Sequence, residues 1–217
     1  MSHVQDSRFL GGVNELTVIT TIKRGRTQDG VLTYKQQLQK VLDSVVNRES
    51  KGIPTPIRLV QTIHFARWII WEDPSSQEDK LIFTSNYDGS MWQYLRDFST
   101  LIAADMDRVW GNCEGYPQQG CRDFDAFWQY VKQHQVKTTA FYAAIPDESL
   151  LRRQSLRSFK ANFDRFMAEW YADERRGCNG EFRQAFDRFV KENQTYLNLE
   201  STDPERPSEH GKKSSSA

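Results

Sequence analysis

The sequence predicts an α+β protein in which a ferredoxin-like βαββαβ sheet is followed by additional C-terminal helices. The first observation is the stretch 62–88, where two apolar segments rich in Ile, Phe and Trp flank the polar turn PSSQED. This pattern is typical of a β-hairpin. The first segment is apolar on both sides of the strand, so we expect cover on both faces of the sheet. The second observation is the order of the predicted elements: strand, helix, strand, strand, helix, strand.

The elements before the hairpin are a strand and a helix. Residues 16–22, LTVITTI, alternate and are rich in β-branched residues, which favours a strand. Thr33 opens a helix, because Gln36 three residues later completes a capping-box pattern. The helix is predicted to end near residues 50–52, since two prolines follow within a few residues and cannot continue it.

The elements after the hairpin complete the sheet unit. Ser90 and Gln93 repeat the capping-box pattern and predict a helix over residues 91–103. Residues 107–113, DRVWGNC, are interpreted as a fourth strand. The whole order is that of a split βαβ, or ferredoxin-like, unit.

The remaining chain is predicted to cover the second face of this sheet. An amphipathic helix is expected over residues 123–134 and a short extra strand over 138–145. A long helix then starts at 146–147, breaks at 176–180, and is followed by a last helix over 181–196.

These elements form one predicted domain over residues 14–199. Its ferredoxin-like core spans 14–117 and its helical cover spans 122–199. Residues 1–13 are predicted to be a flexible arm. Residues 200–217 lack an apolar cluster and are predicted to be a disordered tail.

Charge and composition limit the classes of partner that the protein is expected to bind. Lysine plus arginine number 29, and aspartate plus glutamate number 29, so the formal net charge is zero. This balance removes the simplest argument for a nucleic-acid or acidic-membrane partner. No apolar run reaches the roughly 20 residues of a membrane helix, and the N-terminus lacks the pattern of a signal peptide.

The three cysteines are an odd number without the spacing of a metal site. Buried thiols are the simplest interpretation, and a bridge between Cys113 and Cys121 is the alternative. We expect a reducing, cytoplasmic location.

Two residues of the hairpin are the leading candidates for chemistry, since familiar catalytic and nucleotide-binding motifs are missing from the sequence. His64 lies inside a predicted strand and is either a satisfied core histidine or a proton-transfer group or ligand in a pocket. Arg67 is expected to be buried among apolar neighbours and therefore paired. Its partner is either a carboxylate of this chain, with Glu72, Asp88 and Glu114 as the choices, or an anionic ligand.

Two loops supply further candidate ligand-binding residues. Asn86 and Asp88 lie where a strand ends and a helix begins, although a capped turn explains them equally well. Glu114 and Tyr116 follow the predicted fourth strand and could reach the end of the hairpin. The glycine and the proline beside them are explained equally well by an ordinary turn.

Three segments carry a resemblance: HFARW, KLIFTSNYDGS and VWGNCEGYP. They resemble largely uncharacterised bacterial proteins with HFAR, FTSNFDG and EGYP motifs, over roughly the first two-thirds of the chain. The topology is similar to that of the dimeric α+β barrel superfamily, which includes dye-decolourising peroxidases and chlorite dismutases. That similarity implies haem as a cofactor, but their motifs have no residue-by-residue match here, and a fold alone does not carry function.

Three hypotheses for function remain open from the sequence. The first is a small-ligand-binding protein with a pocket over the sheet, which could be a haem-related oxidoreductase. The second is a non-catalytic interaction module that docks to a partner enzyme. The third is a structural homodimer. Whether the chain is an enzyme, and whether it holds any cofactor, stays open at this point.

Overall fold

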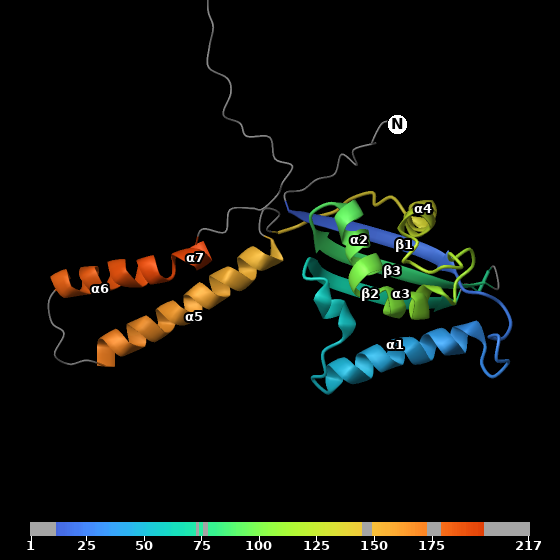
Figure 1. Cartoon of the computed structure of the whole chain (residues 1–217), viewed down its shortest axis with the longest axis horizontal. Coiled ribbons are helices and arrows are strands. Elements are labelled where there is room, and N and C mark those ends of the chain that lie inside the picture. The colour runs from blue at the N-terminus through green and yellow to red at the C-terminus, as the bar shows by residue number, and fades with distance from the viewer. Residues whose placement is uncertain (1–11, 73, 76–77, 145–148, 173–178, 198–217) are drawn as a thin grey trace, which may run out of the picture. The chain divides into compact units, whose positions relative to one another are not determined.

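The computed structural model describes residues 12–72, 74–75, 78–144, 149–172 and 179–197. The described residues form an α+β structure with a three-stranded antiparallel sheet, seven α-helices and one short 3-10 helix (Figure 1). The chain divides into two compact units, Met1–Leu150 and Leu151–Ala217. The predicted single domain over 14–199 therefore stays a prediction. The predicted tail and all of the predicted arm except Gly12 and Val13 lie outside the described residues.

The sheet of the first unit has the order β1-β3-β2. Its strands are β1 (Val13–Thr21), β2 (Ile63–Glu72) and β3 (Asp79–Asp88). β3 is antiparallel to both neighbours, so β1 and β2 run parallel to each other with β3 between them. The predicted hairpin is confirmed as β2 and β3, and its second strand is the centre of the sheet.

The predicted fourth strand at 107–113 is wrong, because α3 (Ala103–Trp110) occupies most of that segment. Met106, Val109 and Trp110 are all buried, and their spacing is that of one helix face. Only Cys113 pairs with the sheet, through a single antiparallel bridge to Ile22.

The predicted extra strand at 138–145 is also wrong over its described residues, 138–144, which form no strand. A single bridge between Val18 and Gln135 joins the preceding segment to the outer edge of β1. Tyr142 is 86% exposed, whereas Phe141 beside it is half-buried, so these residues do not pack as a regular strand of the sheet would.

Local sequence signals explain how the helices of the first unit begin. α1 (Tyr34–Ser50) has the predicted capping box between Thr33 and Gln36. α2 (Met91–Leu101) is capped by the Ser90 side chain, but Gln93 donates to Asp97 instead of completing a box. The predicted helix at 123–134 is confirmed as α4 (Phe124–His134), with Asp123 as its cap. η1 (Pro56–Leu59) leads from α1 into β2.

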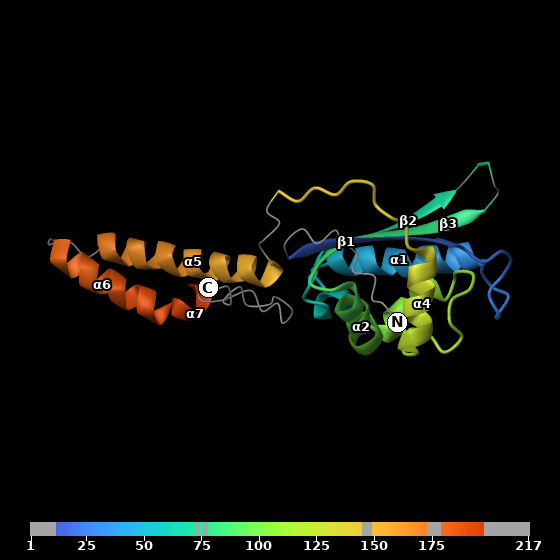
Figure 2. The same ribbon diagram turned by 90° about the horizontal axis from the view of Figure 1, so that it is seen from above.

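The core of the first unit lies on one side of the sheet. Figure 2 shows α1, α2 and α4 on the same side of the three strands, and α3 packs against α1 and α2. Phe83 at the centre of β3 meets Trp110 at a ring distance of 5.2 Å and Trp68 at 5.3 Å. All four helices contribute buried side chains to this core, which accounts for the alternation along β1 and β3.

The other side of the sheet has no described helix of the first unit on it. We call it the open face. It carries Phe65, Arg67, Ile69 and Trp71 of β2, Lys80, Ile82, Thr84 and Asn86 of β3, and Glu15, Thr17, Ile19 and Thr21 of β1. The helical cover expected on this face is therefore not found among the described residues of the first unit.

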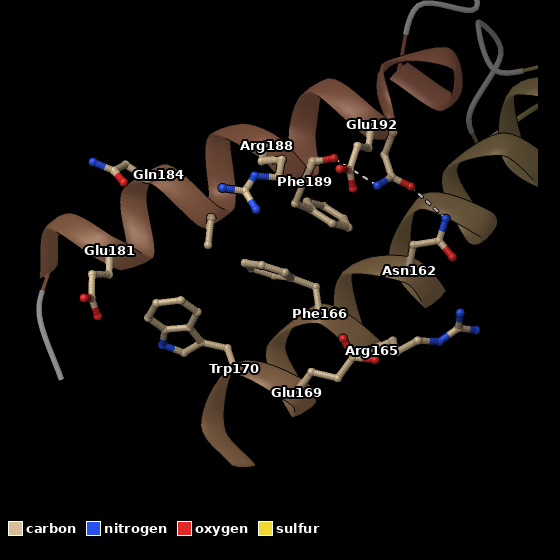
Figure 3. Close-up of a pocket in the computed structure, with 12 residues that line it drawn as sticks. Asn162, Arg165, Phe166, Glu169, Trp170, Glu181, Gln184, Arg188, Phe189 and Glu192 are labelled. Atoms are coloured by element: carbon tan, nitrogen blue, oxygen red, sulfur yellow. Dashed lines mark hydrogen bonds between the residues drawn. The ribbon is translucent and has the colours of Figure 1, made fainter. Parts of the chain in front are cut away.

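The second unit is a helical hairpin. Its helices are α5 (Leu150–Ala172), whose first residue still belongs to the first unit, α6 (Asn179–Glu192) and the short α7 (Gln194–Leu197). Aromatic rings from α5 and α6 face one another along the hairpin (Figure 3). The predicted long helix and last helix are confirmed, whereas the predicted helix start at 146–147 lies outside the described residues.

Candidate functional site

Of the six candidate site residues, the structure brings only His64 and Asp88 together. His64 Nε2 lies 2.6 Å from Asp88 Oδ1, and the two side chains are 6% and 12% exposed. The register between β2 and β3 shifts at Ile63 and Phe65, so His64 sits in a β-bulge opposite the end of β3. A bulge redirects a side chain out of the regular alternation, which the sequence pattern did not show.

Asp88 also forms hydrogen bonds with the backbone around it. Its Oδ2 accepts a hydrogen bond from the N–H of Leu150, the last residue of the first unit, at 2.7 Å. Its own N–H donates to the Thr62 carbonyl at 2.9 Å. Both carboxylate oxygens are therefore engaged, and the pair fixes the start of β2 against the end of β3. An imidazole held by a carboxylate has a defined tautomer and orientation, which suits a structural role and a proton-transfer role alike.

Arg67 lies on the open face and is exposed, so the prediction of a buried arginine paired inside the protein is wrong. Two of the carboxylates considered for it are taken: Glu72 pairs with Lys35, and Asp88 with His64. Arg67 makes no ion pair with any residue in the described part of the chain. The reason is the open face itself, which leaves the alternate residues of β2 in solvent.

Tyr116 and Glu114 are separate from that pair. The Tyr116 hydroxyl donates to Asp107 Oδ1 at 2.6 Å, and the same oxygen accepts the Cys121 N–H at 2.8 Å. Burial, with help from Asp107, raises the pKa of Tyr116 well above its usual range. Glu114 is exposed and uses its backbone N–H to bind the Thr21 carbonyl. We interpret the Tyr116 cluster as structural, since its polar atoms satisfy each other.

The two described cysteines are free and fully buried, so the alternative of a Cys113–Cys121 bridge is wrong. Burial raises the pKa of Cys113 to about 11 and that of Cys121 to about 12. A protonated thiol is neither a nucleophile nor a metal ligand. Cys178 lies outside the described residues.

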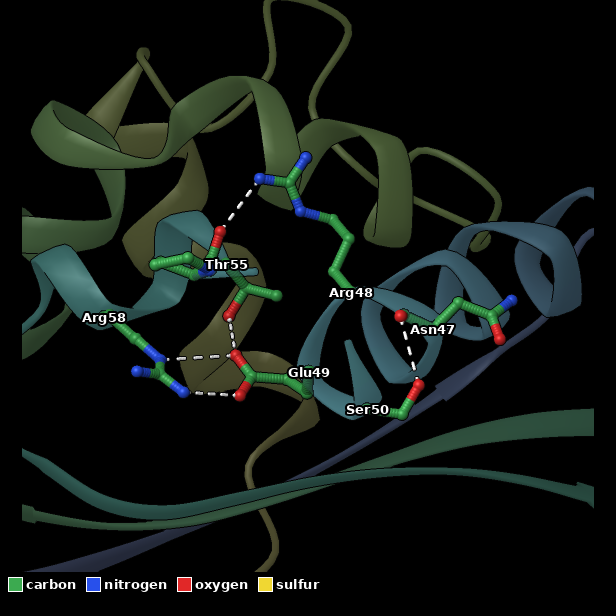
Figure 4. A network of polar contacts seen from close by, with 7 residues as sticks. Asn47, Arg48, Glu49, Ser50, Thr55 and Arg58 are labelled. Carbon is green, nitrogen blue, oxygen red and sulfur yellow. Dashed lines mark hydrogen bonds and ion pairs between the residues drawn. The ribbon is translucent and has the colours of Figure 1, made fainter. Parts of the chain in front are cut away.

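A second polar cluster joins the end of α1 to η1 (Figure 4). Glu49 accepts hydrogen bonds from Arg58 at 2.7 Å and from the Thr55 hydroxyl at 2.6 Å. Arg58, followed by Thr55, lowers the pKa of Glu49 to about 2. Arg48 donates to the Pro54 carbonyl at 2.8 Å. Each of these groups binds within the turn, so the cluster serves to stop the helix and turn the chain.

The sequence contains a signal for the open face, but the structure leads to a different interpretation of that signal. Phe65, Ile69 and Trp71 are 63%, 47% and 46% exposed. The registers align Ile19 with Ile82 and Ile82 with Ile69, so isoleucines from all three strands form one row across the sheet. Asn86, the remaining candidate, pairs with Phe65 on the same face. The signal in the sequence is a strand that is apolar on both sides, which predicts cover by this chain's own helices.

The described residues contain no group of three or more His, Cys, Asp or Glu side chains that could hold a metal ion. Among the helices of the described ranges, none has the length and apolarity needed to cross a membrane.

No family model, no curated protein and no solved structure matches the chain. The resemblance to the HFAR proteins and to the dimeric α+β barrels therefore stays a prediction.

Proposed function

We propose that the protein is a non-catalytic interaction module that docks to another protein, such as an enzyme, through the open face. The observation that carries this proposal is a set of three large apolar side chains, Phe65, Ile69 and Trp71, exposed beside the unpaired Arg67. Contiguous exposed apolar surface with a polar or charged element is typical of a protein-binding site. Trp, Phe and Arg are also enriched at the centres of protein interfaces.

The charge of Arg67 defines the chemistry of the partner. A purely apolar surface placed over this side chain would remove its solvation without replacing it, which costs several kcal/mol. We therefore propose a partner surface that is apolar and presents a carboxylate, because a carboxylate can bind the guanidinium through two parallel hydrogen bonds. β2 is an edge strand, so no strand of the described structure pairs with its outer edge.

A ferredoxin-like sheet is the fold we propose for the first unit. The order β1-β3-β2 supports it, because a strand inserted between two parallel strands is the central feature of a split βαβ unit. In a ferredoxin-like sheet a fourth strand lies beside β1. In this chain Cys113 and Gln135 each form a single isolated bridge on that side of the sheet. A cytoplasmic location is part of the same proposal, and the two buried free thiols support it.

Small-ligand binding at His64 is a second candidate function, favoured by the His64–Asp88 pair. A carboxylate on one imidazole nitrogen is the arrangement that orients a histidine ligand. Haem fits this residue poorly, since Nε2 is engaged by Asp88 and the side chain is only 6% exposed. A Soret band that persists after gel filtration of the haem-treated protein, and is lost in His64→Ala, would establish this second function.

Affinity capture with matched variants tests the leading proposal. The full chain is used to capture proteins from an extract of the producing organism, and the affinity of each recovered protein is then measured by calorimetry. We expect one recovered protein to lose at least ~tenfold in affinity with Ile69→Lys and with Arg67→Glu. Tyr142→Lys, which alters an 86% exposed side chain outside the sheet, is the control and should bind normally. If every recovered protein binds the Ile69→Lys and control variants equally, the open face is not the docking surface.

A further inference from the structure

The second unit contains a groove of about 740 Å³ between α5 and α6 (Figure 3). Phe166 and Trp170 of α5 and Phe189 of α6 line it. The Phe166 and Phe189 rings stack at 4.9 Å and 25°. At one end, Asn162 of α5 donates to Oδ1 of Asn193, the residue that follows α6, at 2.7 Å.

The aromatic seam of this hairpin is incompletely covered. Phe159, Phe163, Phe166, Trp170, Phe182 and Phe186 are only half-buried, and Phe189 alone of the seam is buried. Two helices by themselves can bury only the surfaces that face each other, so a hairpin leaves part of an apolar seam in water. Packing against further helices would bury that remainder, which is worth roughly 25 cal/mol for each Å².

On each of the two helices, the rim of the groove carries positively and negatively charged side chains. Arg165 and Glu169 lie on α5, and Glu181, Arg188 and Glu192 lie on α6 (Figure 3). All five side chains are exposed. None makes an ion pair within the described ranges of the chain.

We infer that a second copy of this chain packs its α5–α6 hairpin into the groove, forming a four-helix bundle. A two-fold symmetric interface must be complementary to itself, because the same patch meets its own copy. A rim with two arginines and three glutamates meets that condition, since cations of one copy can face anions of the other. A rim of one sign would repel its copy. The bundle would also cover the half-buried seam with an identical seam.

Charge-reversal variants test this inference without disturbing the seam. Arg165→Glu with Arg188→Glu makes the rim entirely acidic. Glu169→Lys, Glu181→Lys and Glu192→Lys together make it entirely basic. We expect wild type to dimerise in sedimentation velocity, each rim variant alone to dimerise at least ~tenfold more weakly, and an equimolar mixture to restore a heterodimer. Restoration in the mixture cannot arise from variants that fail to fold.

Two controls separate this interface from other surfaces. Arg157→Glu with Arg183→Glu makes the same change in charge, one on each helix, at exposed positions outside the groove, and should dimerise like wild type. Ile69→Lys on the open face should do the same. The inference is overturned if wild type is monomeric up to near-millimolar concentration, if the mixture fails to form a heterodimer, or if Ile69→Lys dissociates the dimer.

Discussion

His64 Nε2 and Asp88 Oδ1 lie 2.6 Å apart, with the imidazole 6% and the carboxylate 12% exposed. The pair joins a β-bulge at the start of β2 to the last residue of β3. Asp88→Ala would leave the His64 ring nitrogen and the Leu150 N–H without their acceptor. We expect a loss of about 1–3 kcal/mol in the free energy of unfolding, measured by urea titration.

Asp43→Ala is the control for this substitution. Asp43 is exposed and accepts one hydrogen bond from Gln39 within α1. A change within about 0.5 kcal/mol is expected for it. Equal losses in the two variants would show that the His64–Asp88 pair contributes nothing beyond an ordinary surface contact.

Gly120 is predicted to tolerate no side chain. Its φ is +74°, and a Cβ placed there would lie 2.6 Å from both carboxylate oxygens of Asp107. Gly120→Ala therefore combines backbone strain of about 1–3 kcal/mol with displacement of the carboxylate that binds Tyr116. Gly30→Ala is the matched control, because its φ is +69° and a Cβ there meets nothing within 4 Å. A melting temperature that falls equally in both variants would contradict a contact-specific loss at Gly120.

Cys113 and Cys121 are predicted to be unreactive until the protein unfolds. With pKa values of about 11 and about 12, Cys113 and Cys121 have thiolate fractions near pH 8 that are below that of a free cysteine by on the order of 100-fold and 1,000-fold, respectively. In a Cys178→Ser background, iodoacetamide should label both residues at least that much more slowly in the native protein than in urea. Rapid native labelling, seen by mass spectrometry, would show that the thiols are accessible.

The same thiols set a direction for stability at alkaline pH. A group whose pKa is raised by folding stabilises the folded state below its unfolded pKa, about 8.5 for cysteine. That contribution decreases as the pH rises from there through about 11, because the unfolded chain ionises first. Cys113→Ala should therefore flatten the fall in the free energy of unfolding over this window. An unchanged slope would contradict the raised pKa.

Much of the fold could be predicted from local pattern. The capping box at Thr33, the alternation of β1 and the hairpin around PSSQED are all signals carried by a few neighbouring residues. The prediction of a fourth strand is wrong because Val109 and Trp110 are compatible with a strand as well as with a helix. Only their spacing from Met106, three and four residues earlier, distinguishes the two.

The site was less predictable, because it depends on contacts that no local pattern specifies. The pairing of His64 with Asp88 requires the bulge at Ile63 and Phe65, which shifts the register by one position. The apolarity of its strand predicts that Arg67 is buried. That inference fails where an antiparallel sheet leaves one face in solvent, as it does in the first unit here.

Arg67→Met is predicted to affect binding and not stability. Because the guanidinium is exposed and has no ion-pair partner in the described structure, the free energy of unfolding should change by less than about 0.5 kcal/mol. The affinity for the captured partner should fall at least ~tenfold. Chemical denaturation and calorimetry on the same sample give both values. A loss of about 3–5 kcal/mol in stability would mean that Arg67 pairs with a buried carboxylate after all.

Site-specific photo-crosslinking at position 69 tests most directly whether the open face docks to another protein. A photoreactive amino acid replaces Ile69 in the full chain, and a second sample carries it at Val46, which is 66% exposed on α1. After irradiation in the cell extract, mass spectrometry identifies the cross-linked peptides. The proposal predicts cross-links from position 69, but not from 46, to an apolar segment with a carboxylate in another protein. Cross-links from position 69 that reach only this chain, whether residues 151–197 or a second copy, would contradict it.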